Sequence, residues 1–457
     1  MIIDHPLSAE DRKISQKRML IFNCINGFSY MCLGETLIIL LAVKMMMPDT
    51  LITILGAMQY IGFVLLPLGV WRAGKVGAAQ CQADFWVARN IAALLAAAGA
   101  IVSLKFPPLG WGMLLLSSFT FYGSRAAGVV LCQPLTGEVT TSEERPQFIA
   151  WCGVTFYLFG VIALILVSLT LHFHDSLYVL CGVIVVGAAL GVTASSLMRG
   201  VRETTTLQES ARKKILPELK LSLKNPIIVQ QLFAGFWATM LIVTILPVSI
   251  LMIKKGYGFT NTQSLFFSST QFIACFSVSY LTGKIAAKKG PRYLLILGYL
   301  AHIVMAACWV IAPFSGLGWI IPLALILFAI YGSGVVMAEN AIQGYFLMTV
   351  PKEQQVISAV LINVLRGFCA GIGGMLLASG LLKLAQYLVT FVLPHIQKLF
   401  PGAPEQLVIY KLYFVMLLPC ILIGFCQVLK LKTVIYSFKE KYGDEAVKQA
   451  VLPQRKN

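Results

Sequence analysis

The sequence has few charged residues. Only 12% of its 457 residues are Asp, Glu, Lys or Arg, whereas 58% are hydrophobic. A soluble globular protein carries about 25% charged residues. The chain therefore lacks the polar side chains that would be needed to cover a water-exposed surface, and this excludes a soluble protein.

Sequence motifs of common enzyme classes are also missing. There is no HExxH, no phosphate-binding P-loop and no GxSxG, so nothing points to a zinc protease, a nucleotide-driven pump or a serine hydrolase. The 11 cysteines form no CxxC pair, and all except Cys81 lie in apolar stretches, so we interpret them as small buried hydrophobes. We expect a protein that is not an enzyme and has no cofactor and no metal.

Long apolar runs are what the sequence has in abundance. A membrane-spanning helix needs about 20 mainly apolar residues. Runs of this kind predict an all-α integral membrane protein with twelve transmembrane helices, at residues 19–43, 50–71, 86–105, 111–134, 148–171, 176–198, 227–253, 262–283, 292–313, 318–344, 355–382 and 408–430.

Basic residues predict the orientation of these helices. If the N-terminus is cytoplasmic and the spans alternate, most of the 36 Lys and Arg residues fall on the cytoplasmic side, including Arg72, Lys75 and Arg89 around the second-to-third loop. The positive-inside rule then places both termini in the cytoplasm of a multi-pass protein of the cell inner (plasma) membrane. We attribute the net charge of +17 to topology and to contact with membrane lipids, not to nucleic acid.

A polar, basic segment divides the chain into two halves. We predict an N-terminal six-helix bundle at 1–198, a cytoplasmic central loop at 199–225, and a C-terminal six-helix bundle with a cytoplasmic tail at 226–457. The two bundles are expected to be pseudo-symmetric. We expect a monomer.

Two short basic turns occupy corresponding places in the two halves. They read GVWRAGKVGAA at 69–79 and GKIAAKKGPR at 283–292. With the six-plus-six arrangement, these turns resemble the major facilitator superfamily, whose members carry a glycine-punctuated basic motif there. The resemblance implies that a set of residues gates the conformational change, namely Gly69, Gly77, Gly283, Lys288, Gly290 and Arg292.

The acidic residue of that family motif is missing from both turns. Ala287 stands at its position in the second half, and no aspartate lies between Gly69 and Gly77. In the family this acid helps to latch the outward-open state. Asp84, at the start of the third span, is the candidate substitute.

Four charged side chains lie deep within the predicted spans: Glu35, Arg125, Glu339 and Arg366. Charged residues at such depth are costly and usually face the bundle interior or water. They are either structural ion pairs, most simply Glu339 with Arg366, or parts of a transport site. In the second interpretation Arg125 binds an anionic substrate group, for which a guanidinium has bidentate geometry, and Glu35 and Glu339 couple transport to protons.

Polar and aromatic residues on the same predicted helices complete the candidate substrate site. The resemblance implies a central cavity lined by helices one, four, seven and ten, with two, five, eight and eleven beside them. The candidates, together with Arg125, are Gln59, Tyr60, Tyr157, Trp237, Gln271, Asn363 and Arg366.

We therefore expect a secondary transporter that works by alternating access. The favoured hypothesis is proton-coupled symport of a small anionic or polar solute. One alternative is a cation-coupled sugar symporter, because PLTGEVTTSEER at 134–145 resembles a loop of sugar–cation symporters, with Glu138 and Arg145 at its acid and base positions. The other alternative is an exporter of amphiphilic compounds.

Overall fold

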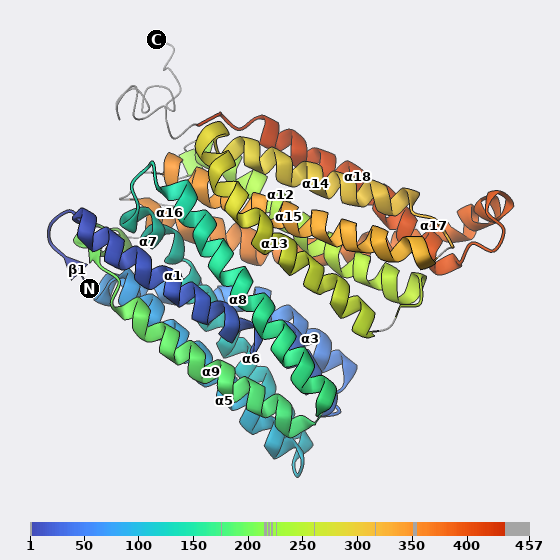
Figure 1. Cartoon of the computed structure of the whole chain (residues 1–457), viewed down its shortest axis with the longest axis horizontal. Coiled ribbons are helices and arrows are strands. Elements are labelled where there is room, and N and C mark those ends of the chain that lie inside the picture. The colour runs from blue at the N-terminus through green and yellow to red at the C-terminus, as the bar shows by residue number, and fades with distance from the viewer. Residues whose placement is uncertain are drawn as a thin grey trace. The chain divides into compact units, whose positions relative to one another are not determined.

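The computed structural model describes residues 2–174, 176–213, 217, 220, 223–224, 226–259, 261–315, 317–350 and 354–434. These residues are almost entirely helical (Figure 1). The chain forms two compact units. The first contains Met1–Asn225 and Leu347–Phe368, and the second contains Pro226–Phe346 and Cys369–Asn457. The domain limits predicted from the sequence stay a prediction.

The first unit is a bundle of antiparallel helices with a few short elements at its ends. Within it α5 packs against α6 and α9, and α1 packs against α8 and α9 (Figure 1). Its elements are β1 (Ile2–Ile3), α1 (Ala9–Met31), α2 (Glu35–Lys44), α3 (Asp49–Ile61), η1 (Gly62–Leu65), α4 (Leu66–Val76), α5 (Ala78–Ser103), α6 (Pro107–Val129), α7 (Cys132–Val139), α8 (Arg145–Phe173), α9 (Leu177–Arg199), β2 (Glu203–Thr204), α10 (Thr205–Arg212) and α16 (Gln355–Asn363).

The second unit is also built from long helices. In it α14 packs against α13 and α18, and α12 packs against α17 and α18. Its elements are α12 (Pro226–Leu251), η2 (Met252–Gly256), α13 (Asn261–Lys289), α14 (Pro291–Ile311), α15 (Leu317–Thr349), α17 (Ala370–Leu399) and α18 (Glu405–Leu429). The end of α15, from Leu347, belongs to the first unit, and so does η4 (Val364–Cys369) up to Phe368.

Every predicted span falls on helix. Among the described residues, 9 helical segments are long and apolar enough to cross a membrane. The predicted spans 19–43, 50–71 and 262–283 lie on α1–α2, α3–α4 and α13, which are not among those 9. Helices satisfy all their backbone hydrogen bonds internally, which is why long apolar runs in a bilayer adopt this form. The prediction of an all-α integral membrane protein is confirmed.

The predicted spans are not all regular helices, and the first and the eleventh contain candidate site residues at their irregularities. The first is interrupted between Met31 and Glu35, where Gly34 has extended backbone angles (φ −67°, ψ 175°) and forms the N-cap of α2. The eleventh contains the π-helical turn η4 between α16 and α17. Apolar composition alone does not reveal either irregularity, because the residues at both places remain largely apolar.

Candidate functional site

Arg125 lies in the second half of α6, within a membrane-spanning helix, and its side chain is half-buried. Its guanidinium carbon sits 5.1 Å from the centroid of the Tyr30 ring, which is in the last turn of α1. A cation at this distance is attracted by the negative face of the ring. Within the described part of the chain, Arg125 makes no hydrogen bond and no ion pair.

A chain of aromatic contacts extends from this point into α8. The Tyr30 ring lies 6.0 Å from the ring of Phe156, and Phe156 lies 5.5 Å from Tyr157 in an edge-to-face arrangement. The structure therefore brings two predicted site residues, Arg125 and Tyr157, to the same side of the first unit. Gln59 and Tyr60, on α3 of the same unit, are both half-buried.

Glu35 is the first residue of α2, immediately after the interruption of the first span. The placement of its side chain lies outside the described residues. Its backbone position is informative, because the first turn of a helix has free N–H groups and the positive end of the helix dipole. A carboxylate on this residue is electrostatically favoured there.

Arg89 was assigned to the second-to-third loop by the sequence analysis, and the structure corrects this. The residue lies eleven positions into α5, about 16 Å along the helix. Its side chain is only 1% exposed. One terminal nitrogen, Nη2, donates a hydrogen bond to Oδ1 of Asn26 at 3.0 Å, and the same oxygen accepts one from the indole of Trp86 at 2.9 Å.

The remaining substrate-site candidates lie elsewhere in the chain. Trp237 (α12) is half-buried, and Gln271 (α13) is buried, with its backbone carbonyl against Gly332 of α15. Asn363 ends α16, and its amide donates a hydrogen bond to the carbonyl of Ala359 at 2.8 Å, one turn earlier. That amide group is thus partly engaged by its own helix.

The two charged candidates of the second half, Glu339 and Arg366, belong to different compact units. Glu339 lies on α15 in the second unit, and Arg366 lies on the π-helical turn η4 in the segment that belongs to the first unit. Both side chains are half-buried. Their pairing stays a prediction.

The two glycine-punctuated turns have the same backbone geometry. Gly77 (φ 89°, ψ 165°) precedes α5, and Gly290 (φ 80°, ψ 165°) precedes α14. Positive φ of this size is accessible mainly to glycine. This equivalence supports the alignment of the two loops. Gly283 is buried near the end of α13, and Lys288 is exposed.

Each turn is tied to the C-terminal end of the last helix in its half. Asp84 of α5 forms ion pairs with Arg72 at 2.6 Å and with Arg199, the last residue of α9, at 3.3 Å. In the second unit Arg292 donates hydrogen bonds to the Leu429 carbonyl at 2.6 Å and to the Thr433 hydroxyl at 2.8 Å, at and just after the end of α18. Asp84 is thus placed where a loop-anchoring acid would act.

A second carboxylate, which the sequence analysis missed, binds the same turn. Glu203 is completely buried, and its two oxygens accept hydrogen bonds from the backbone N–H groups of Ala78 at 2.8 Å and Ala79 at 3.1 Å. These are free N–H groups of the first turn of α5, so Glu203 caps this helix from a distant part of the chain. Burial raises the pKa of Glu203, and the two N–H groups counteract that effect. The charge pattern of the central loop gives no signal for this contact.

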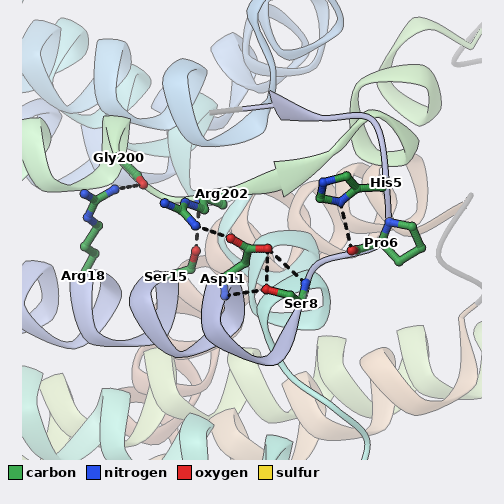
Figure 2. A network of polar contacts seen from close by, with 8 residues as sticks. All are labelled: His5, Pro6, Ser8, Asp11, Ser15, Arg18, Gly200 and Arg202. Atoms are coloured by element: carbon green, nitrogen blue, oxygen red, sulfur yellow. Dashed lines mark hydrogen bonds and ion pairs between the residues drawn. The ribbon is translucent and has the colours of Figure 1, made fainter.

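The residues before α1 and after α9 form a polar network (Figure 2). The Ser8 and Asp11 side chains make a capping box at the start of α1, and Asp11 forms an ion pair with Arg202. The hydrogen bonds from Ser8, followed by those from Arg202, lower the pKa of Asp11 to about 2. Arg18 donates a hydrogen bond to the Gly200 carbonyl, so the segment after α9 is fixed along α1.

Glu138 and Arg145, the residues of the sugar-symporter resemblance, are both buried in the first unit. The Thr204 hydroxyl donates a hydrogen bond to Glu138 at 2.6 Å. Arg145 donates hydrogen bonds to the Thr140 hydroxyl at 3.1 Å and to the Leu347 carbonyl at 3.0 Å. Glu138 therefore holds the Thr204 side chain of β2, and Arg145 holds the end of α15, within the first unit.

Apolar helices with charged residues held inside them define a multi-pass membrane protein. A family model described as Major Facilitator Superfamily matches residues 19–374. The chain belongs to this superfamily, and the predicted fold and resemblance are confirmed. No curated protein sequence matches the chain.

Solved structures of several transporters share the fold. The proton:xylose symporter XylE, bound to 6-bromo-6-deoxy-D-glucose, is 13% identical with a TM-score of 0.66, over 98% of this chain and 100% of that one. A bacterial homologue of the iron transporter ferroportin is 15% identical with a TM-score of 0.62, over 91% and 99%. The human organic anion transporter MFSD10 is 13% identical with a TM-score of 0.62, over 91% and 99%. At these identities the likeness shows the fold and not the solute.

Proposed function

We propose that the protein is a proton-coupled symporter of a small anionic or polar solute, placed in the inner membrane with both termini in the cytoplasm. The observation that carries this proposal is the position of Arg125. Its guanidinium is half-buried within a span, rests on the Tyr30 ring, and makes no hydrogen bond or ion pair within the described residues. A cation in such a place is stabilised by a ligand of opposite charge, because the surrounding hydrocarbon offers none.

The interruption of the first span supports the same location. Tyr30, the ring partner of Arg125, lies in the last turn of α1, and Glu35 begins α2 just beyond the interruption. In transporters, discontinuous helices commonly form the substrate and ion sites, because their free backbone groups are available there. We therefore place anion binding at Arg125 and proton binding at Glu35, on the two sides of this site at the interruption of the first span.

The coupling follows from this arrangement. A proton on Glu35 removes a negative charge from the neighbourhood of Arg125 and leaves the guanidinium available to an anion. In reverse, a bound anion favours protonation of Glu35, because it adds negative charge close by. Alternating exposure of the site then moves proton and solute together.

Ligand binding is tested first on purified protein. A thermal-shift screen against sugars, carboxylates, phosphates and amino acids identifies a ligand. Arg125→Lys is then expected to weaken binding of that ligand by about tenfold or more, because an ammonium replaces the bidentate fork. Lys105→Gln, at the exposed turn before α6, is the control and should bind normally. Unchanged affinity in Arg125→Lys contradicts the role of Arg125.

Proton coupling is tested on proteoliposomes with the identified ligand. Glu35→Gln is expected to abolish accumulation driven by a pH gradient while it leaves exchange of labelled for unlabelled solute intact. A protonophore should abolish accumulation by the unaltered protein. Accumulation that survives the protonophore excludes proton coupling.

The sugar-symporter alternative rests on the buried residues Glu138 and Arg145. It predicts that neutral hexoses stabilise the protein in the same screen and that carboxylates and phosphates do not. A neutral ligand whose binding does not change in Arg125→Lys favours this alternative.

A further inference from the structure

Arg89 is a buried cation without a counter-ion among the described residues. Its Nη2 donates to the side-chain oxygens of Asn26 at 3.0 Å and Asn90 at 3.4 Å, and its Nε is buried with no hydrogen-bond partner. Buried arginines are usually paired with a carboxylate, because desolvation of an unpaired charge is expensive. Arg89 is held by amide oxygens only, so its positive charge remains uncompensated by these partners.

Two aromatic rings flank the same guanidinium. Its central carbon lies 5.1 Å from the centroid of the Trp86 ring and 5.5 Å from that of Phe121. Rings at these distances stabilise the charged form of the side chain. The surroundings of Arg89 thus keep a cation in place without neutralising it.

Arg89 and Arg125 are neighbours. On α1, Tyr30 (the ring partner of Arg125) follows Asn26 (the acceptor of Arg89) by four residues. On α6, Arg125 follows Phe121 by four residues, and residues at this spacing share a helix face. Arg89 thus contacts α1 and α6 one turn before Tyr30 and Arg125, which brings the two positive charges close together.

We propose that Arg89 and Arg125 together make the site selective for solutes with two negative charges, such as dicarboxylates or phosphate monoesters. This inference rests on the proposed function, in which Arg125 contacts an anionic substrate. Arg125 is the contacting residue, because it is half-buried. Arg89 is a positioning residue that acts through its charge, because it is 1% exposed. A second negative charge on the solute is attracted by the second cation, and in a partly buried site one such interaction changes affinity by about tenfold or more.

Matched ligands of different charge test this selectivity on the purified full-length protein. Isothermal titration at pH 7.5 compares glucose 6-phosphate with glucuronate and glucose, succinate with succinamate and succinamide, and sulfate with methyl sulfate. We expect the doubly charged member of at least one series to bind about tenfold more tightly than the singly charged member. Equal affinities of mono- and dianions overturn the inference while the proposed function stands. If no anion binds, both fail.

Variants then test whether Arg89 is responsible. Asn26→Asp places a carboxylate beside Arg89 and neutralises it without removing it, and it should reduce the dianion preference to about that of Arg89→Gln. Arg89→Lys keeps the charge and should keep the preference. Melting temperature and gel-filtration profile establish that each variant is folded. If the folded variants Asn26→Asp and Arg89→Gln keep the wild-type preference for dianions, the role of Arg89 is overturned. If these variants do not fold, the ligand series measured on the wild type decides whether the site prefers dianions.

Discussion

The Glu203 carboxylate accepts a hydrogen bond at 2.8 Å from the backbone N–H of Ala78, which lies 125 residues earlier in the chain. The contact is possible because β1 and β2 pair in parallel, Ile2 with Glu203 and Ile3 with Thr204. It is also possible because Gly77 has no side chain: a Cβ there would lie 2.5 Å from Oε1 of Glu203. Glu203, which lies four residues beyond the end of α9, therefore holds the start of α5.

This relationship predicts that Gly77 and Glu203 act as a unit. Glu203→Ala leaves two N–H groups of α5 without a partner and is expected to cost about 1–3 kcal/mol of stability. Gly77→Ala is expected to cost a similar amount, because φ of 89° is strained for alanine and its methyl group meets the carboxylate. The double variant should lose less than the sum of the two, because the alanine at 203 relieves the clash.

Thermal denaturation in detergent micelles measures these losses. Glu209→Ala, at an exposed position on α10, is the matched control for the loss of a glutamate. Gly112→Ala, where a Cβ would meet no atom within 4 Å, is the control for the glycine. Strict additivity of the two substitutions contradicts the coupling.

The lowered pKa of Asp11 predicts how the stability of the protein depends on pH. This pKa is lowered from 3.8 to about 2 by Ser8 and Arg202. A lowered pKa means that the folded state binds the proton less tightly than the unfolded state, so the contribution is complete above about pH 4 and is lost as the pH falls through about 2. The difference in melting temperature between the wild type and Asp11→Asn should therefore shrink as the pH is lowered from 6 to 3.

Removal of Arg202, the basic partner of Asp11, tests whether Asp11 causes this pH dependence. Arg202→Gln should show the same trend as Asp11→Asn, only weaker, because the Ser8 hydrogen bonds remain. A difference that is constant over the whole pH range shows that the titration of Asp11 makes no contribution.

Close packing of α4 on α6 depends on Gly69. A Cβ at this position would lie 1.9 Å from the carbonyl oxygen of Ala127, which is closer than any real contact. Gly69→Ala should therefore force the two helices apart and destabilise the protein by about 1–3 kcal/mol. The same substitution at Gly112, in open space, should leave the melting temperature unchanged. Equal melting temperatures of the two variants would show that the helices separate without cost.

The membrane fold could be predicted from the sequence because hydrocarbon imposes one solution. Every long apolar run must satisfy its backbone groups internally, so each run predicts a helix. The loop glycines Gly77 and Gly290 were also informative, since positive φ at both is a local property of glycine. The helix interruption at Gly34 was not predictable, because the apolar run continues on both sides of Gly34, Glu35 and Thr36 and a single glycine does not by itself end a helix.

The buried charges show where such reasoning stops. Arg89 stands at the edge of an apolar run, and a count of loop charges places it in water. Its burial depends on Asn26, which is 63 residues earlier, and on Phe121 of another helix. One signal was present in the sequence, since Trp86, Arg89, Ala93 and Ala96 recur at helical spacing and predict a single buried face.

Asp84 gives a prediction that separates gating from stability. Its ion pairs with Arg72 and Arg199 are partly exposed, since the side chains of these arginines are 42% and 50% accessible. Exposed pairs of this kind contribute about 0–1 kcal/mol, so Asp84→Asn should hardly change the melting temperature. If Asp84 supplies the acid that the loop motif lacks, the same variant should lower the rate of solute uptake by proteoliposomes several-fold. Asp11→Asn, which removes another ion pair of the same unit, is the matched control and should leave uptake near normal at pH 7. Equal uptake by the two variants would remove Asp84 from the gating residues and leave it as an anchor for the end of α9.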